Sequence, residues 1–342
     1  MATASPDARA AGGSLYAPLR LPLFRTLWLA NLVSNLGWVI QATAAAWLMT
    51  SLAGTADKVA LVQAAVQAPI VLLSLVAGAA ADVWDRRLVL LVAQLWMLAV
   101  SVLLAALTAA GLVAPWSLLA LTFALGLGAA LQGPAFQAAI RELVPGEQFA
   151  AAVTLNGLAF NSARSVGPAI AGAIIAAAGA PAAFIVNAVS YLGLIGVLAR
   201  WRRPPSQDDL PRERVGSAIL TGLRYVAETR VIRHVLIRAA AFGFAAGAPM
   251  ALLPLIARDF LDGGPVTYGV LVAGFGIGAM AGAFLIQPLR QRIGAEHLVR
   301  WMAAAFALQL VVLALVKVTA AMLVALALGG MAWLGSFTSF NI

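Results

Sequence analysis

Apolar residues fill long stretches of this chain, and polar or charged residues are concentrated in the short breaks between them. A helix needs roughly 20 mostly apolar residues to cross the hydrocarbon core of a bilayer. Stretches of this length predict ten membrane-spanning helices, at residues 24–49, 59–81, 88–110, 116–140, 151–178, 182–199, 239–257, 266–289, 298–316 and 318–342. The breaks carry turn and charge signals, such as Gly179 to Pro181 and Asp262 to Pro265.

The composition places these helices in lipid. Of the 342 residues, 63% are hydrophobic and only 10% are charged, whereas a soluble domain is about half apolar and about a quarter charged. We therefore predict an all-α membrane protein. The predicted parts are a disordered N-terminal tail (1–20), a six-helix N-terminal bundle (21–200), a cytoplasmic linker (201–233) and an incomplete C-terminal bundle (234–342) of about four helices.

The basic residues orient the predicted helices. With the N-terminus inside, 18 of the 22 Lys and Arg residues fall on the inner side, and only Lys58, Arg258 and Lys317 fall outside. This asymmetry is the one that the positive-inside rule requires. We therefore expect a multi-pass protein of the cell (inner or plasma) membrane with a cytoplasmic N-terminus. The net charge of +9 is then a topological signal, so we predict the lipid bilayer and no nucleic acid as a partner.

The linker and the repeat are two further features of the pattern. Apolar residues recur at helical spacing over 219–226, which fits a helix at the inner headgroup layer; a solvated linker with incidental periodicity explains the pattern equally. The two groups of spans resemble each other when one is slid by about 203 residues, because Gly78 then falls near Gly282 and Arg86 on Arg290. Internal repeats are typical of transporters. The second group has four spans where the first has six, so we expect two further helices.

Neutral polar residues form a stripe within the first group of spans. The members of two pairs, Asn31 with Asn35 and Gln63 with Gln67, lie four residues apart and therefore on one helix face. We predict that the stripe lines a solute cavity; hydrogen bonding between helices is the competing explanation. The stripe consists of Asn31, Asn35, Gln41, Gln63, Gln67, Gln132, Asn156 and Asn161.

Arg164 is the one ionisable residue deep within a predicted span, about 15 Å from its inner end. A charge at that depth is costly and marks a functional site by default. It could attract an anionic group of a solute, or it could bond carbonyls and amides of neighbouring helices and so lock the bundle. Gly167 and Pro168 beside it would weaken the helix and leave carbonyls free. No Asp or Glu, the usual proton carriers, lies near the middle of a span. The sequence therefore leaves the coupling ion open.

Other chemistries find little support in the sequence. The chain has no cysteine, and its two histidines, His234 and His297, lie beside arginines near span ends, so we predict no metal site and no cofactor. It has neither the H-E-x-x-H nor the G-x-S-x-G motif of common enzymes, and no G-x-x-x-x-G-K-[ST] loop for ATP. We predict that it is not an enzyme. A polytopic membrane enzyme and a non-transporting remnant of a transporter remain the alternatives.

Four motifs resemble a known family. Gly78-x-x-x-Asp82 followed by Asp85, Arg86 and Arg87 resembles the inner-loop signature of the major facilitator superfamily. Three further motifs resemble its subgroup of siderophore and macrolide exporters. They are Phe24-Arg25-x-Leu27-Trp28, Gly133-Pro134-Ala135-Phe136 with Arg141-Glu142-Leu143-Val144-Pro145, and Asn161-x-x-Arg164-x-x-Gly167-Pro168-x-x-x-Gly172.

The resemblance implies a monomeric secondary transporter that exports a small amphipathic solute, siderophore or drug-like, by alternating access. It also implies that the loop of Gly78, Asp82, Asp85, Arg86 and Arg87 closes the inner side; alternatively, Asp82 merely balances the arginines. The resemblance assigns packing or hinge roles to Gly133, Pro134, Gly167, Pro168 and Gly172. The chain departs from the pattern at Val83, where a basic residue is common, and the second copy of the loop, 282–294, has no acid.

Overall fold

The computed structural model describes residues 14–53, 55–201, 224 and 228–340, and every regular element in these residues is helical. This confirms the predicted all-α class. Each predicted span is helical, with end positions that differ from the prediction by a few residues in most cases. The main helices are α2 (Pro22–Ala53), α3 (Ala56–Val83), α4 (Arg86–Ala109), α5 (Pro115–Leu143), α6 (Phe149–Arg200), α8 (Arg230–Leu255), α9 (Pro265–Ile293), α10 (Ala295–Leu315) and α11 (Thr319–Phe340).

Helix α6 contains two of the predicted spans. At about 1.5 Å per residue its 52 residues would extend far beyond one bilayer. The chain turns at Gly179, where φ is 77° and ψ is 174°, a conformation that is essentially restricted to glycine. The legs before and after Gly179 both pack along α2, since Gly167 in the first leg meets Val39 and Asn187 in the second bonds Gln41.

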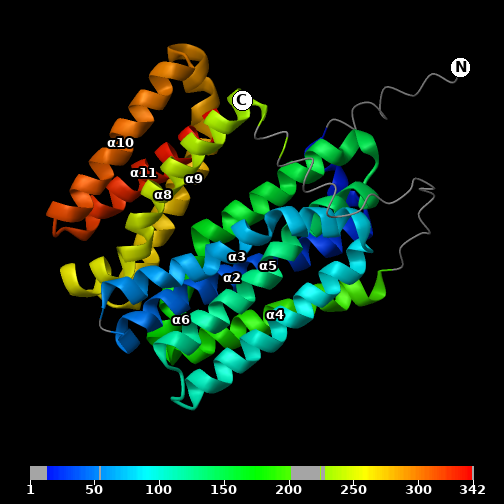
Figure 1. Ribbon diagram of the computed structural model, residues 1–342, viewed down its shortest axis with the longest axis horizontal. Helices are drawn as coiled ribbons and strands as arrows, with labels where there is room; N and C mark the ends of the chain where they lie inside the picture. Colours follow the sequence, from blue (N-terminus) through cyan, green and yellow to red (C-terminus); the bar gives the residue numbers. More distant parts are fainter. Residues whose placement is uncertain (1–13, 54, 202–223, 225–227, 341–342) are drawn as a thin grey trace, which may run out of the picture.

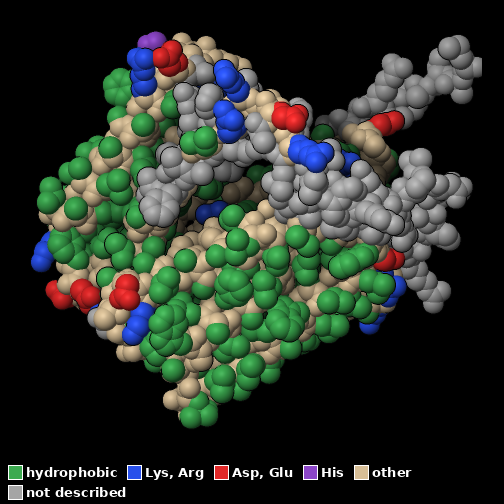
Figure 2. Space-filling view, in the orientation of Figure 1, with side chains coloured by type: hydrophobic (Ala, Val, Ile, Leu, Met, Phe, Trp, Pro, Cys, Tyr) green, Lys and Arg blue, Asp and Glu red, His purple; other side chains and the backbone are tan. Residues whose placement is uncertain are grey.

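Large apolar side chains cover the outside of the bundle (Figure 2). Val71, Leu72 and Leu315 are each at least 70% exposed, which water would penalise and lipid favours. Eight helices contain a stretch long and apolar enough to cross a membrane, counting α6 once and only the described residues. The exposed apolar belt and the helix lengths both indicate a multi-pass membrane protein.

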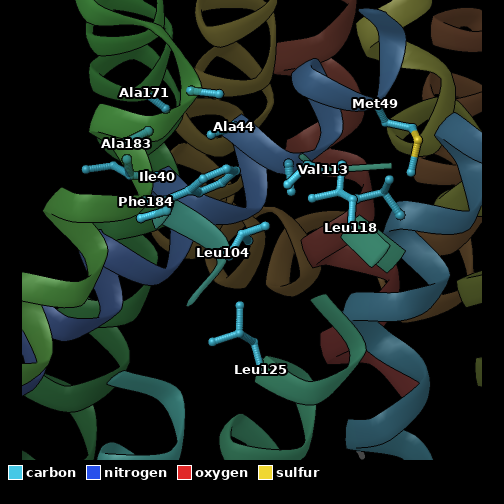
Figure 3. Close-up of a cluster of buried hydrophobic side chains, with 14 of the residues drawn as sticks. Ile40, Ala44, Met49, Leu104, Val113, Leu118, Leu125, Ala171, Ala183 and Phe184 are labelled. Atoms are coloured by element: carbon cyan, nitrogen blue, oxygen red, sulfur yellow. The ribbon is translucent and has the colours of Figure 1, made fainter. Parts of the chain in front are cut away.

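The N-terminal half, α2 to α6, has an apolar core at each end. One core joins Phe24 and Leu90 to Leu198 at the end that carries Arg86, Arg87, Arg141 and Arg200, here called the basic end. The other includes Met49, Leu118 and Phe184 and lies toward Gly179, at the end here called the far end (Figure 3). The second leg of α6 returns to the basic end, where Trp201 is buried.

The pairing of helices in the N-terminal half recurs in the C-terminal half, α8 to α11. Helix α3 and helix α4 each pack along α5, and α9 and α10 likewise each pack along α11. The neighbouring helices α3 and α4 barely touch, as do α9 and α10. Helices α3 to α5 and helices α9 to α11 are therefore packed alike, as the internal similarity of the sequence predicts.

The two halves meet chiefly where α6 packs against α9, with smaller contacts of α8 on α3 and α2. In Figure 1 the halves are inclined to each other, close together near the far end and apart toward the basic end. Figure 2 shows a hollow between them with a basic side chain inside it. We call this hollow the crevice.

Two predicted boundaries need correction. The tail was expected to be disordered through residue 20, but Ala17–Arg20 form a 3₁₀ turn (η1) in which Ala17 and Pro18 are buried. Leu15, Leu19 and Leu21 anchor this segment against the basic-end core. Helix α8 also begins at Arg230, nine residues before residue 239, where the span was predicted to start. Its first turns therefore carry the polar Arg230 and Arg233, ahead of the apolar stretch. Residues 1–13 and most of the predicted linker lie outside the described residues.

Replacing Gly179 with Ala should destabilise the turn between the legs of α6. A side chain in this backbone region costs about 1–3 kcal/mol, and we expect a loss of that size in the free energy of unfolding. Gly157→Ala is the matched control, because Gly157 is helical and an added Cβ there would meet nothing within 4 Å. Thermal unfolding in detergent measures both variants, and equal stability of the two would contradict the assigned turn.

Candidate functional site

Three residues of the predicted polar stripe come together from three helices. The Asn31 amide on α2 donates to Asn156 Oδ1 on α6 at 3.1 Å, and the Gln132 amide on α5 donates to Asn31 Oδ1 at 3.2 Å. Asn31 is buried, while Gln132 and Asn156 are half-buried. The stripe therefore includes an interhelical network in which both the amide and the oxygen of the Asn31 side chain have a partner.

Four other stripe residues are less constrained. Asn35, one turn beyond Asn31, is half-buried, as is Gln63, and Gln67 is exposed. Among the described residues, none is hydrogen-bonded to these three side chains. Asn161 donates to the carbonyl of Gly157 in its own helix at 2.9 Å. The side-chain amides of Asn35, Gln63 and Gln67 thus have no hydrogen-bond partner among the described residues.

Gln41 lies apart from this group, inside the N-terminal half. Its side chain is only 3% exposed, and its Oε1 accepts from Ser101 Oγ at 2.6 Å and from the Asn187 amide. Asn187 also donates to Tyr191 Oη at 3.1 Å. Sequence reasoning did not single out Ser101 or Asn187, although each is a polar residue in an otherwise apolar stretch. This network ties α2, α4 and the second leg of α6 together, so Gln41 serves packing here.

Arg164 lies halfway along the first leg of α6 and keeps exposed surface. Its guanidinium carbon lies 5.6 Å from the ring centre of Phe160 and 5.3 Å from that of Trp333 on α11. Both distances are within the range of cation–π attraction. Because Trp333 belongs to the other half, Arg164 stands at the boundary of the two halves.

Close backbone contacts form the seam between α6 and α9. An added Cβ on Gly172 would lie 2.5 Å from the Pro265 carbonyl oxygen, and one on Gly276 would lie 2.6 Å from Ser165 Cα. A Cβ on Gly269 would collide with the Pro168 carbonyl. Only glycine permits such an approach, and small residues are the usual means by which helices associate in lipid. The seam runs from the level of Arg164 toward the far end.

The other predicted packing glycines differ from one another. Gly167 faces Val39 of α2, whose Cγ1 would lie 2.8 Å from an added Cβ. Gly133 has no heavy atom within 4 Å of such a Cβ and is exposed, and the neighbouring Pro134 lies within helix α5. The local packing therefore requires glycine at 167 but not at 133.

A second group of contacts, not foreseen from sequence, closes the far end. The rings of Trp47 on α2 and Tyr268 on α9 stack with their centres 6.0 Å apart. Arg258, in the π-helical turn η3 (Ile256–Phe260), donates to the Thr50 carbonyl of the other half. It also pairs with Asp259 through bonds of 2.6 and 3.0 Å, which lower the pKa of that carboxyl. These contacts are called the far-end clasp.

The loop predicted to close the inner side forms several bonds within the N-terminal half. Asp85 caps α4 by accepting from the backbone N–H of Arg87 at 2.9 Å and of Leu88 at 3.2 Å. Arg86 pairs with Glu142 of α5. Arg87 donates to the carbonyls of residues 198 and 199 at the end of α6. The side chain of Asp82 lies outside the described part, and Gly78 has no neighbour near an added Cβ.

A pocket of about 360 Å³ lies between α10 and α11. Gln309 is the only amide side chain in its lining, which is otherwise apolar. Residues from the N-terminal half do not contribute to this lining, so the pocket is separate from the crevice between the halves.

Two similar helix bundles joined by a seam, with a crevice between them, are the architecture of the major-facilitator fold. Comparison with known proteins gives the family. The chain matches the transmembrane secretion effector family over residues 13–342 and belongs to it. The family and the relatives are transporters, which confirms that the chain is not classed with enzymes.

Two curated relatives illustrate the family. The staphyloferrin A transporter of Staphylococcus aureus is 27% identical over 231 residues, which cover 66% of this chain and 57% of the relative. The multidrug efflux pump Tap of Mycobacterium tuberculosis is 30% identical over 231 residues, covering 63% and 53% respectively. The match thus spans little more than half the length of these relatives.

Solved structures share the fold. A crystal structure of the nucleoside transporter NupG superposes with a TM-score of 0.71 at 12% identity and covers 93% of this chain and 81% of its own. A bacterial homologue of the lysosomal transporter Spinster, inward-facing and unoccupied, gives 0.66 at 15% identity, with 93% and 75% covered. These likenesses establish the major-facilitator fold.

Asn31→Ala should destabilise the protein more than Asn35→Ala. The first variant removes two hydrogen bonds between helices, worth about 0.6–2 kcal/mol each in a membrane. The second removes none among the described residues and serves as the matched control one turn away. The free energy of unfolding in mixed micelles tests this difference. Equal losses for both variants would show that the Asn31 network contributes nothing.

Proposed function

We propose that this protein is a secondary-active exporter that moves a small amphipathic solute by alternating access. The observation that carries the proposal is the placement of the contacts between the halves. The seam and the far-end clasp join the halves toward the far end, whereas the halves part toward the basic end and leave the crevice between them (Figures 1 and 2). Two similar bundles hinged in this way can rock about the seam, so that the crevice opens to each side of the membrane in turn.

The distribution of charge supports an assignment of the two sides. The arginines of the basic end, Arg86, Arg87, Arg141 and Arg200, face the cytoplasm if the positive-inside rule holds. The far end, with the clasp of Arg258 and Thr50, then faces outward. In this state the crevice would receive solute from the cytoplasm, as an exporter must at the start of its cycle.

The chemistry around the crevice supports an amphipathic solute. The amide of Asn35 lies without a partner in the described residues, and Gln132 and Asn156 are only half-buried. Aromatic rings such as Phe160 and Trp333 offer apolar surface beside them. Apolar sites with a few polar groups accept drug-sized molecules of varied shape. The relatives, a staphyloferrin A transporter and a multidrug efflux pump, suggest siderophore-like and drug-like solutes as the classes to test.

The far-end clasp acts as the outer gate in this proposal. Release of solute outward would require the Trp47–Tyr268 stack and the Arg258–Thr50 bond to break while the basic ends close. A single aromatic pair contributes about 0.5–1.5 kcal/mol, and a hydrogen bond from a charged group, such as the part-buried one of Arg258, contributes about 1.5–3 kcal/mol. The clasp is therefore weak enough to open and close during transport.

An efflux panel tests the function itself. Cells that express the full chain should accumulate less of at least one compound among a carboxylate siderophore, a macrolide and a fluorescent dye than cells with the empty vector. Dissipation of the ion gradients should abolish the difference, because a secondary transporter has no other energy source. Equal accumulation of every compound, with the protein verified in the membrane, would refute the proposal.

Cross-linking the clasp should stop transport. The chain has no native cysteine, so Thr50→Cys with Arg258→Cys places the sole two thiols across the halves. A short bifunctional thiol reagent should hold the far end shut and reduce efflux to background, and a cleavable linker should restore efflux after reduction.

The matched control is Trp96→Cys with Ala124→Cys. Trp96 donates to the Ala124 carbonyl at 2.6 Å, which is the same kind of contact as that of Arg258 with Thr50, but within one half. Linking α4 to α5 should leave efflux unchanged. If cross-linked Thr50–Arg258 protein still transported solute, rocking about the seam would not be the mechanism.

A further inference from the structure

Arg164 has no conventional partner for its charge. Among the described residues, no carboxylate is paired with its guanidinium and no carbonyl or side-chain oxygen accepts a hydrogen bond from it. The described ion pairs join other residues: Arg86 with Glu142, Arg258 with Asp259 and Arg300 with Glu296. The rings of Phe160 and Trp333 attract the guanidinium only weakly, by about 0.5–2 kcal/mol each. A cation at mid-span normally pairs with an anion or lines a polar cavity.

The geometry around Arg164 favours a ligand over a lock. The expected alternative role, bonding carbonyls of neighbouring helices, would show as hydrogen bonds from the guanidinium, and none is found in the described residues. The carbonyl of Arg164 itself is covered by Gly276, so the backbone is held in the seam while the side chain stays exposed. The helix is thus anchored at the point from which the guanidinium projects.

We infer that Arg164, Phe160 and Trp333 form a binding site for the acidic group of an aromatic anion, a carboxylate or sulfonate attached to a conjugated ring. This inference rests on the proposed function, because it names the solute class for the same crevice. The guanidinium presents a planar set of N–H donors that matches a carboxylate in two parallel bonds. The rings of Phe160 and Trp333 offer faces on which the conjugated part can stack.

The site is shared between the halves. Phe160 and Arg164 are one turn apart on α6, and Trp333 is on α11. Rocking about the seam would change the distance from Arg164 to Trp333, so that an anion held by both would be bound differently in the two states. Differential binding of this kind is what links a solute to a conformational change.

Binding to purified full-length chain in nanodiscs of zwitterionic lipid tests the site. Tritiated 2-naphthoate is the probe, and neutral 2-naphthamide and cationic 2-naphthylmethylammonium are the competitors. The protein should bind naphthoate, and the amide and the amine should compete poorly. Arg164→Gln should weaken naphthoate binding by about tenfold to a hundredfold, since a hydrogen bond to a charged group is strong.

Further variants separate the site from general effects on folding. Arg164→Lys keeps the charge and should bind with intermediate affinity, and Trp333→Leu should weaken binding about threefold to tenfold while Trp333→Phe retains it. Arg300→Gln is the control for net charge, because Arg300 is exposed and its one ion-pair partner in the described part of the chain is Glu296, one turn away. It should bind naphthoate as the wild type does.

Wild-type affinity in Arg164→Gln, or equal binding of naphthoate and naphthamide by the wild type, would overturn the site. If naphthoate binding failed this test but cells exported a neutral or cationic compound, the protein would still be an exporter, of another solute class. If purified protein bound naphthoate in a way that depends on Arg164, while cells expressing the chain exported no compound, the site would be supported and the exporter refuted.

Discussion

The close packing of α6 against α9 is the contact on which the arrangement of the halves depends. In lipid, apolar side chains gain nothing by leaving their surroundings, so helices associate where small residues let their backbones approach. Gly172, Gly269 and Gly276 provide that approach along one stretch of the two helices. The halves are held there, at the clasp and where α8 contacts α3 and α2. The position of a few glycines thereby decides which side of the molecule is open.

The polar groups inside the bundle divide into two kinds. Asn31 and Gln41 are buried, and their bonds to other helices offset the cost of placing amides in an apolar interior. Asn35 and Arg164 keep surface toward solvent and have no hydrogen-bond partner among the described residues. The first kind stabilises the scaffold, and we propose that the second binds the solute. Spacing along the chain places both kinds on the same faces, so only the three-dimensional contacts separate them.

The spans could be predicted closely because lipid imposes a length and an apolar composition on each helix. The turn at Gly179 was also visible, since glycine and proline stand between two apolar runs. The residues on other helices with which the polar side chains form hydrogen bonds could not be predicted. Asn187 bonds Gln41 from 146 residues away, and Arg258 reaches a backbone carbonyl of Thr50, which has no sequence signature. Sequence likewise could not reveal that Arg86 and Arg87 bind within their own half. The roles assigned to the stripe and the inner loop stay predictions.

The central claim is that the two halves rock about the seam. Distances between spin labels in the full chain in nanodiscs measure this directly. One pair lies at the basic end, Glu147→Cys with Arg292→Cys, and one at the far end, Asp57→Cys with Asp262→Cys; all four native residues are exposed. On addition of a transported solute the account predicts that the basic-end distance shortens while the far-end distance lengthens. Two distances that stay constant, or that change in the same direction, would contradict it.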